Sequence, residues 1–304
     1  MFLPVEPWTA DEGLASHLER RGVSRRDFLQ FCAEMTAILG LSTALTPRIA
    51  EALEKTKRPP VIWLQLQECT GCVESVIRTS DPTIGDLVLE TISLDYSHTL
   101  MAAAGDAAEK AKQASMKENF GKYILIVTGS VPMKDGGVYF TSGGRTARSL
   151  LEDAAKGAAA VLALGACAHF GSVQSAKPNP TGAVGIDAII KDKPVVNIAG
   201  CPPIADVVTG TIVHFLTFGR LPDLDGDGRP LFAYGSRIHD QCPRRAKFDA
   251  GQFVQAFDDE AARKGWCLYH VGCKGPAPIG KLVCPFHMKI GQGEKVAGPL
   301  QPTW

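Results

Sequence analysis

Between residues 60 and about 205 the chain alternates short apolar segments with longer helical patterns. The apolar segments are rich in strand-forming residues and cover 60–66, 87–95, 123–130, 159–165 and 194–199. Helical patterns cover 71–79, 98–117 and 145–157, and a further amphipathic helix is predicted at 203–219. Such alternation packs as a parallel sheet with right-handed crossovers and helices on both faces. We therefore predict an α/β fold with a doubly wound parallel sheet.

Cysteines directly follow three of these predicted strands. A Cys-x-x-Cys pair follows the first strand, and single cysteines follow the fourth and the fifth: Cys69, Cys72, Cys167 and Cys201. Open α/β sheets bind ligands at the carboxyl ends of their strands, so the four thiolates can converge on one site. A Cys-x-x-Cys alone is ambiguous, because redox disulfides, zinc sites and iron–sulfur sites all use it. Single cysteines are often only small buried hydrophobic residues, but that alternative requires three coincidences at one sheet edge.

The cysteine count favours metal ligation over a disulfide framework. The chain has 304 residues and nine cysteines, an odd number and too few for a disulfide-stapled scaffold. Its length indicates one or two domains. Its formal net charge of zero gives no indication of nucleic acid or an anionic membrane surface as a partner. Metal ions or clusters are therefore the expected ligands of these cysteines.

From about residue 231 the sequence has few regular elements but holds four of the nine cysteines. One histidine and three cysteines make a complete set of four ligands: His239, Cys242, Cys267 and Cys273. On spacing alone this set fits a Cys3His zinc site, and a structural zinc would staple an irregular tail. Cys284 follows, and no cysteine comes after it.

The connection at 221–230 imitates the start of a calcium-binding loop with Asp223, Asp225 and Asp227. The twelfth position of such a loop holds a bidentate glutamate. Tyr234 stands at that position in this chain. We therefore interpret the segment as a turn-rich connection.

Residues 1–52 have the features of a twin-arginine export signal. An arginine pair, Phe-Leu, a modest apolar segment and a small-x-small cleavage site follow one another at Arg25-Arg26, Phe28-Leu29, 35–45 and Ala50-Glu51-Ala52. The apolar segment is too short for a permanent membrane anchor, as in a removable leader. The alternative is an amphipathic surface helix with two exposed arginines. Cys32 lies inside the segment and would be removed with it.

Taken together, the motifs closely resemble those of the small subunit of nickel–iron hydrogenases. The resemblance covers roughly residues 24–276 and is carried, in order, by Glu68-Cys69-Thr70-Gly71-Cys72, Gly165-Ala166-Cys167, Gly200-Cys201-Pro202-Pro203, His239-Asp240-Gln241-Cys242-Pro243-Arg244-Arg245, Trp266-Cys267 and Gly272-Cys273-Lys274-Gly275-Pro276. The twin-arginine leader matches the exported members of that family.

The resemblance implies a flavodoxin-like domain at 53–220 with a proximal 4Fe–4S cluster, followed by a small, irregular iron–sulfur cluster-binding domain at 221–304. The implied proximal ligands are Cys69, Cys72, Cys167 and Cys201, and a distal 4Fe–4S cluster would take His239, Cys242, Cys267 and Cys273. Dihydrogen would be split at the Ni-Fe centre of a separate large subunit. This chain would hold no catalytic residue and would pass electrons singly to an acceptor, such as a cytochrome or a membrane quinone-reducing partner.

Two details refine what the resemblance implies. Oxygen-tolerant relatives carry extra cysteines at positions that correspond to Gly71 and Phe140 here, so we expect an ordinary cubane proximal cluster and an oxygen-sensitive enzyme. The family's medial 3Fe–4S cluster takes three cysteines, and only Cys284 is a candidate for one of them. The sequence after Pro276 departs from the family, which suggests a chain truncated or altered after about 276, or a medial site that is lost or differently ligated.

Two alternatives remain open. The cluster-bearing subunit of a complex I-type quinone oxidoreductase shares the Gly-Cys-Pro-Pro element, but it lacks the leader and the second set of ligands. A zinc-stapled binding protein is the non-enzymatic alternative. The leader implies a location in the periplasm or on the outer face of the cytoplasmic membrane. The membrane anchor of some relatives is missing, because no run of about 18 apolar residues occurs.

Overall fold

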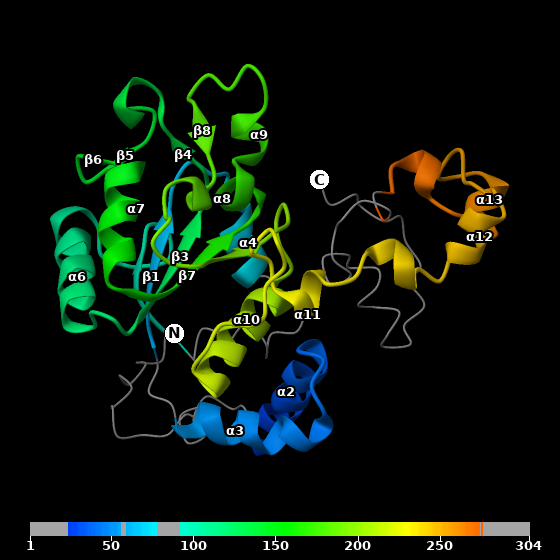
Figure 1. The fold of residues 1–304 in the computed structure, drawn as a ribbon, viewed down its shortest axis with the longest axis horizontal. Coiled ribbons are helices and arrows are strands. Elements are labelled where there is room, and N and C mark those ends of the chain that lie inside the picture. The colour runs from blue at the N-terminus through cyan, green and yellow to red at the C-terminus, as the bar shows by residue number, and fades with distance from the viewer. Residues whose placement is uncertain (1–23, 56–58, 78–91, 274, 276–304) are drawn as a thin grey trace, which may run out of the picture.

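The computed structural model describes residues 24–55, 59–77, 92–273 and 275 (Figure 1). At its centre is a five-stranded, all-parallel sheet with the strand order β2-β1-β3-β7-β9. The strands are β1 (Pro60–Gln65), β2 (Ser93–Ser97), β3 (Tyr123–Thr128), β7 (Ala158–Leu164) and β9 (Val195–Ile198). Counting only these strands, the order is the 2-1-3-4-5 of flavodoxin-like sheets. The predicted doubly wound α/β fold is therefore confirmed.

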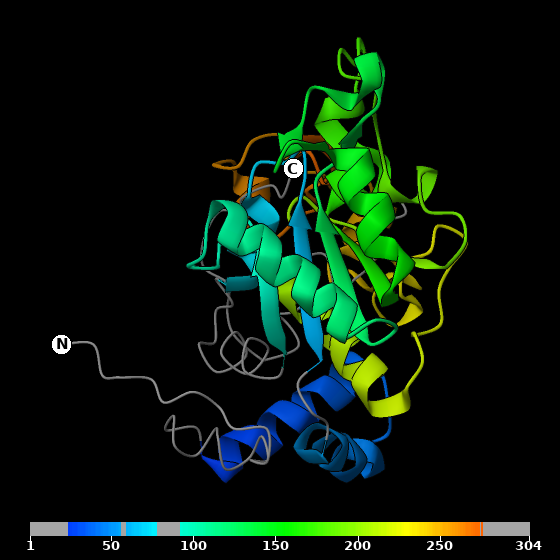
Figure 2. The same ribbon diagram turned by 90° about the vertical axis from the view of Figure 1, so that its left-hand side faces the viewer.

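Helices cover both faces of the sheet (Figures 1 and 2). One face packs against α6 (Gly105–Glu118), α7 (Ala147–Lys156) and α8 (Ala166–Phe170), and the other against α4 (Gly71–Ile77) and α10 (Ala205–Phe218). Successive side chains of a strand point to opposite faces. In β1, Ile62 and Leu64 join the first core, whereas Val61 and Trp63 join the second. Burial on both sides explains why the strands read as nearly continuous apolar runs.

Short elements follow the carboxyl ends of the strands. β4 (Val131–Pro132) pairs antiparallel with β8 (Ala183–Val184), and β5 (Thr141–Ser142) pairs antiparallel with β6 (Arg145–Thr146). The others are η2 (Lys134–Gly137), α9 (Ser172–Ser175) and η3 (Ile186–Ala188). These loops and turns form the edge of the sheet at which the cysteines lie.

The helix predicted at 98–117 begins later, at Gly105. The hydroxyl of Ser97 accepts hydrogen bonds from the backbone N–H groups two and three residues further on, at 3.4 and 3.3 Å. Nδ1 of His98 accepts a hydrogen bond from the backbone N–H of Gln65 at 3.1 Å. These side-chain bonds hold the residues after β2 in a turn and compete with helix formation.

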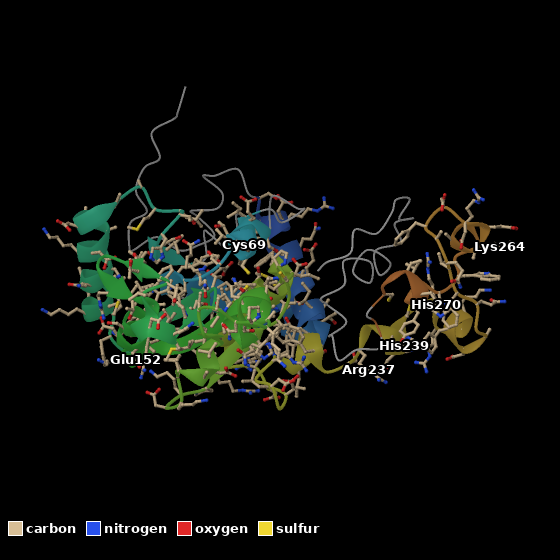
Figure 3. The ribbon with its side chains drawn as sticks, turned by 90° about the horizontal axis from the view of Figure 1, so that it is seen from above. Cys69, Glu152, Arg237, His239, Lys264 and His270 are labelled. Atoms are coloured by element: carbon tan, nitrogen blue, oxygen red, sulfur yellow. The ribbon has the colours of Figure 1, made fainter. Side chains whose placement is uncertain are left out.

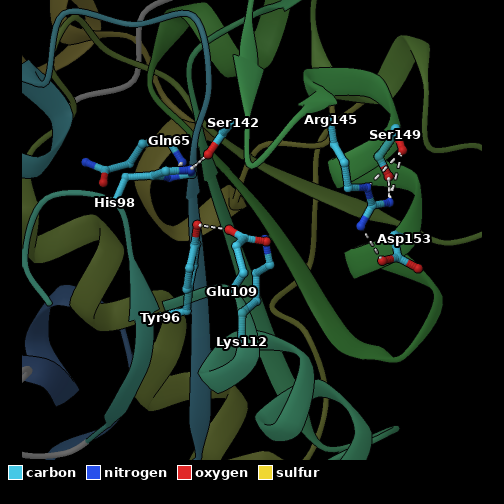
Figure 4. Close-up of polar contacts among 9 residues, drawn as sticks. All are labelled: Gln65, Tyr96, His98, Glu109, Lys112, Ser142, Arg145, Ser149 and Asp153. Atoms are coloured by element: carbon cyan, nitrogen blue, oxygen red, sulfur yellow. Dashed lines mark hydrogen bonds and ion pairs between the residues drawn. The ribbon is translucent and has the colours of Figure 1, made fainter. Parts of the chain in front are cut away.

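Polar contacts tie the edge strand β2 to α6 (Figure 4). The hydroxyl of Tyr96 donates to Glu109 at 3.0 Å, and Nζ of Lys112 pairs with the other oxygen of that carboxylate at 2.6 Å. The same ammonium lies 4.7 Å from the centroid of the Tyr96 ring. The buried lysine thus has a carboxylate and an aromatic ring as partners, which fits a structural role. Of the strand predicted at 87–95, residues 87–91 lie outside the described residues.

Two N-terminal helices, α2 (Arg25–Ile38) and α3 (Thr46–Lys55), are joined by η1 (Thr43–Leu45) and lie against α10 (Figures 1 and 2). They enclose a third hydrophobic core, which includes Val213 of α10. Arg25 and Arg26 are exposed. In the folded chain the arginine pair thus lies at the exposed start of a helix whose other face is buried.

The connection before the C-terminal part is turn-rich, as predicted. The Asp225 carboxylate accepts hydrogen bonds from the backbone N–H groups of Asp227 (3.0 Å) and Arg229 (2.8 Å). Its second oxygen lies 2.8 Å from Nε of Arg229, and the guanidinium also pairs with Asp227 at 3.2 Å. A guanidinium therefore neutralises the carboxylates that resemble a calcium loop in the sequence.

The C-terminal part extends away from the sheet domain (Figures 1 and 3). It consists of loops and the short helices α11 (Leu231–Tyr234), η4 (Ile238–Gln241), α12 (Arg245–Asp249), α13 (Glu260–Arg263) and η5 (Tyr269–Val271). This agrees with the irregular character predicted from about residue 231. Across the described ranges, no helix has the length and apolar character needed to cross a membrane.

Candidate metal centres

The four cysteines that follow strands lie together at the carboxyl edge of the sheet. Cys69 precedes α4 and Cys72 lies in its first turn, while Cys167 is the second residue of α8 and Cys201 follows β9. The sulfur of Cys72 is close enough to the other three sulfurs to interact with them electrostatically. The structure thus brings together the four residues whose positions after strands predicted one site.

Glycines make room for these sulfurs. A Cβ atom at Gly165 would lie 2.4 Å from Sγ of Cys72, and one at Gly200 would lie 2.5 Å from Cα of Pro203. Both glycines have positive φ angles, of +93° and +148°, which favour a residue without Cβ. The hydroxyl of Ser75 donates a 2.6 Å hydrogen bond to the carbonyl of Pro203, which ties α4 to the turn after β9. The loops around the four sulfurs therefore have no space for a side chain at either glycine.

The chemistry of the four donors fits a cationic metal group. Burial raises the pKa of Cys72, Cys167 and Cys201. For Cys72 the nearby Glu68 carboxylate and the other three sulfurs raise the pKa further. Neighbouring thiolates in such a site repel one another, and coordination to a cation both deprotonates thiols and offsets the repulsion.

A single metal ion and a polynuclear cluster make different demands on their ligands. In the part of the chain that the structure describes, no three His, Cys, Asp or Glu side chains are placed to hold one metal ion. A single zinc ion requires its sulfur ligands within about 2.3 Å of one point. Four cysteines of a 4Fe–4S cluster are instead spread around the cluster.

The second predicted set lies in the C-terminal part, where Figure 3 labels His239. Burial raises the pKa of Cys242, and the sulfurs of Cys273 and Cys267 raise it further, so these three thiols are neighbours. The backbone N–H of His239 donates to the carbonyl of Gly275 (3.1 Å), whose own N–H donates to Sγ of Cys273 (3.3 Å). The loops that carry all four residues are therefore joined. Cys284 lies outside the described residues.

Two polar residues beside Cys167 were missed by sequence reasoning. The side chains of Gln174 and Ser172 lower the pKa of this thiol as hydrogen-bond donors, against the effect of burial. Nε2 of Gln174 also donates to the carbonyl of Gln67 (3.1 Å), whereas its buried Oε1 has no partner among the described residues. The Gln174 amide thus donates through its N–H groups while its oxygen accepts nothing from the described residues. A group that acts only as a donor is suited to an anionic acceptor such as a thiolate.

Ser172 stands in a strained backbone conformation. Its φ angle is +48°, in the left-handed region that non-glycine residues rarely adopt. Strain of this kind clusters at functional sites, where the surrounding structure holds it in place. No spacing rule in the sequence marks this serine, because it begins α9, a helix of four residues that is too short to show a repeating pattern.

Family comparisons cover both parts of the chain. A family model described as NADH ubiquinone oxidoreductase, 20 Kd subunit, matches residues 69–215. A second model, which describes the C-terminal part of the NiFe/NiFeSe hydrogenase small subunit, matches residues 234–287. The second match includes Cys284. The match therefore runs past Pro276, to residue 287, further than the motifs in the sequence indicated.

Individual relatives give the same result. The chain is 54% identical over 259 residues to the uptake hydrogenase small subunit of Azotobacter vinelandii, which covers 85% of this chain and 72% of that protein. It is 51% identical over 266 residues to the Hydrogenase-1 small chain of Escherichia coli strain K12, with 88% and 72% covered. Among solved structures, the reduced, active Ni-Fe-Se hydrogenase from Desulfomicrobium baculatum aligns with a TM-score of 0.69 at 32% identity, over 75% of this chain and 87% of that chain.

A flavodoxin-like sheet whose carboxyl edge is occupied by thiols is the scaffold of a cluster-bearing redox protein. Within that class, the chain belongs to the small-subunit family of nickel–iron hydrogenases. Members of this family carry iron–sulfur clusters and pair with a large subunit. The predicted family is thus confirmed, and the match of the sheet domain to the 20 Kd subunit explains why the complex I-type alternative shared its Gly-Cys-Pro-Pro element.

Proposed function

We propose that this chain relays electrons singly from hydrogen oxidised in a partner large subunit, through iron–sulfur clusters, to an acceptor. We assign a proximal 4Fe–4S cluster to Cys69, Cys72, Cys167 and Cys201, and a distal one to His239, Cys242, Cys267 and Cys273. The observation that carries the proposal is the meeting of four thiols from three strand ends at one sheet edge. Bound clusters supply the one-electron redox chemistry, while the surrounding residues set their potential.

The large subunit is the proposed cover of the proximal site. Cys69 and Cys201 are exposed in this chain alone, so this site is open to solvent on one side. Beside Cys167, Phe170 of α8 and Val173 of α9 are 58% and 79% exposed. Large apolar side chains around an open polar site suit a protein interface. Covering this edge would exclude water from the proximal ligands.

Replacing Gln174 with Leu is expected to lower the reduction potential of the proximal cluster. Hydrogen bonds to cluster sulfurs favour the more negative, reduced state. Loss of about 1 kcal/mol from that state corresponds to roughly 40 mV for one electron. A redox titration followed by electron paramagnetic resonance measures the potential. Gln113→Leu, at an exposed position of α6, is the matched control. Equal potentials in the two variants would contradict a role for Gln174.

The acceptor, proposed to be a cytochrome or a membrane quinone-reducing partner, would dock near the distal site. The ring of His239 lies edge-on to Phe248 at a centroid distance of 4.4 Å. Phe248 also contacts Tyr269, which is 47% exposed. This aromatic cluster leads from the histidine to the surface. A medial 3Fe–4S cluster that uses Cys284 stays a prediction, because that residue lies outside the described ranges.

The proposed location follows from the proposed leader. We propose that residues 1–52 direct export by the twin-arginine route, which places the protein in the periplasm or on the outer face of the cytoplasmic membrane. The exposed Arg25 and Arg26 at the start of α2 support this proposal.

Reconstitution with the large subunit tests the proposed relay. The complex is expected to reduce a one-electron dye under hydrogen, whereas neither subunit alone is expected to do so. Cys242→Ala is expected to retain part of the dye reduction but to lose reduction of a cytochrome acceptor, because only the distal site is damaged. A complex that forms and retains its iron, yet transfers no electrons from hydrogen, would contradict the proposal.

A further inference from the structure

We infer that the twin-arginine segment docks on α10 of the folded protein and that this docking withholds the signal from the export machinery until α2 and α3 detach. The inference rests on the export proposed above. It adds a gate, meaning that export can begin only after α2 and α3 have left α10. Such a gate would couple release of the leader to the state of the folded sheet domain, since α10 packs on both.

The docked helices form a closed hydrophobic core with α10. Its most deeply buried members are at most 3% exposed: Phe28, Phe31, Cys32 and Met35 of α2, Ile49 and Leu53 of α3, and Val213 of α10. Burial of large apolar side chains is the main favourable term in helix packing. The segment is therefore folded as part of the domain and does not project from it.

The surface of α10 is shaped for this contact. A Cβ atom at Gly210 would lie only 3.4 Å from Cγ2 of Ile38, so the missing side chain lets α2 approach closely. Val213 stands one turn further along α10, on the same face. Near the end of that helix, the guanidinium of Arg48 lies 5.2 Å from the centroid of the Phe218 ring. The contact thus runs along most of α10.

Docking hides two parts of the signal. Phe28, which follows the arginine pair, is 1% exposed. The candidate cleavage site at Ala50-Glu51-Ala52 lies inside α3, and Ala50 is 6% exposed. Proteolytic cleavage needs exposed, locally unfolded backbone. While the helices stay on α10, the arginine pair is exposed but Phe28 and the cleavage site are not available.

Two electrostatic features limit how firmly α2 is held. Arg25 and Arg26 occupy the first turn of the helix, where cations oppose the helix dipole, although Ser24 and Asp27 cap this end. Across the interface, the Glu34 carboxylate faces Asp206 in the first turn of α10. Burial and this second carboxylate raise the pKa of Asp206. A receptor that binds the arginines would therefore act on the less stable end of the docked segment.

Cys32 provides a built-in reporter of docking. It is fully buried, and its peptide can be identified by mass spectrometry after the full-length precursor is treated with iodoacetamide. Val213→Asp places a charge in the core from α10 without changing the signal. Alkylation of Cys32 is expected to rise at least about tenfold, because a buried unpaired charge opens the contact. Val138→Asp, at a position that is 63% exposed, is the matched control and is expected to match the wild type.

A second variant acts in the opposite direction. Glu34→Gln removes the repulsion with Asp206 and leaves the twin-arginine motif unchanged, so it is expected to slow both the alkylation of Cys32 and the removal of the leader in cells. Val213→Asp is expected to speed leader removal several-fold, because local opening exposes the cleavage site to the protease. If Cys32 is freed and leader removal does not change, the gate is disproved.

Two further outcomes separate docking from export. Alkylation of wild-type Cys32 as fast as in Val213→Asp would show that the helices do not dock, whatever the route of export. Normal processing of the double variant Arg25→Lys/Arg26→Lys would overturn the export proposal and the gate with it. The relay assigned to the two cysteine groups would be unaffected by either result.

Discussion

Replacing Cys167 with Ala is expected to remove the proximal cluster and to lower hydrogen-dependent dye reduction by more than about 100-fold. Loss of a mere supporting partner of a metal ligand already costs about 10–100-fold, and a direct ligand should cost more. Gln174 and Ser172 donate hydrogen bonds to Cys167, so its removal also leaves these two donors without their sulfur acceptor. Iron analysis, electron paramagnetic resonance and dye reduction by the heterodimer with the large subunit measure the three effects.

Cys32→Ala, compared with Cys167→Ala in heterodimers that keep the full-length chain, is the matched control for this substitution. Cys32 is also a free cysteine, but it belongs to the core of α2, α3 and α10. Burial there raises the pKa of its thiol to about 12, which keeps it protonated and unreactive. The control is expected to retain iron and activity. Equal iron content in the two variants would show that Cys167 is not a ligand.

Gly165→Ala is expected to abolish the proximal cluster although it removes no ligand. The new methyl group would lie 2.4 Å from Sγ of Cys72, a distance that real Cβ atoms do not adopt. The sulfur would have to move, and metal sites do not tolerate misplaced ligands. The expected result is a heterodimer with about four irons fewer than the wild type and little dye reduction.

Gly219→Ala separates the steric effect from backbone strain. Gly219 also has a positive φ angle, +66°, but nothing lies within 4 Å of a Cβ built there. Both substitutions place a Cβ on a residue with a positive φ angle, at a cost of about 1–3 kcal/mol; Gly219 is left-handed, whereas Gly165, with φ 93° and ψ 162°, lies in a region that only glycine readily adopts. Only the substitution at Gly165 presses on a sulfur. Gly219→Ala is expected to lower the melting temperature slightly and to keep its iron. Similar iron losses in both variants would attribute the effect to general destabilisation.

The sheet could be predicted because its strands are buried on both faces. Such strands read as apolar runs of a length that helices rarely have, and their alternation with helical patterns leaves few topologies. The grouping of Cys69, Cys72, Cys167 and Cys201 followed from the same rule, since parallel strands end at one edge. Their role as ligands stays a prediction that the substitutions above test.

Other features depended on contacts that the sequence does not display. The late start of α6 at Gly105 results from hydrogen bonds of Ser97 and His98, which outweigh local helix propensity. The donors beside Cys167 come from α9, a four-residue helix that begins at a strained serine and shows no periodic pattern. The docking of α2 on α10 depends on Gly210, because the absence of a side chain there lets the two helices approach closely. Tertiary packing decides such features.

The most direct test of the central claim is the metal content of the purified heterodimer, measured together with its electron paramagnetic resonance. Two 4Fe–4S clusters predict about eight irons and matching labile sulfide in the small subunit, with signals from reduced clusters. A 3Fe–4S signal in the oxidised heterodimer would add a medial cluster to the relay. Zinc in place of iron, with no paramagnetic signal from the small subunit, would contradict the account.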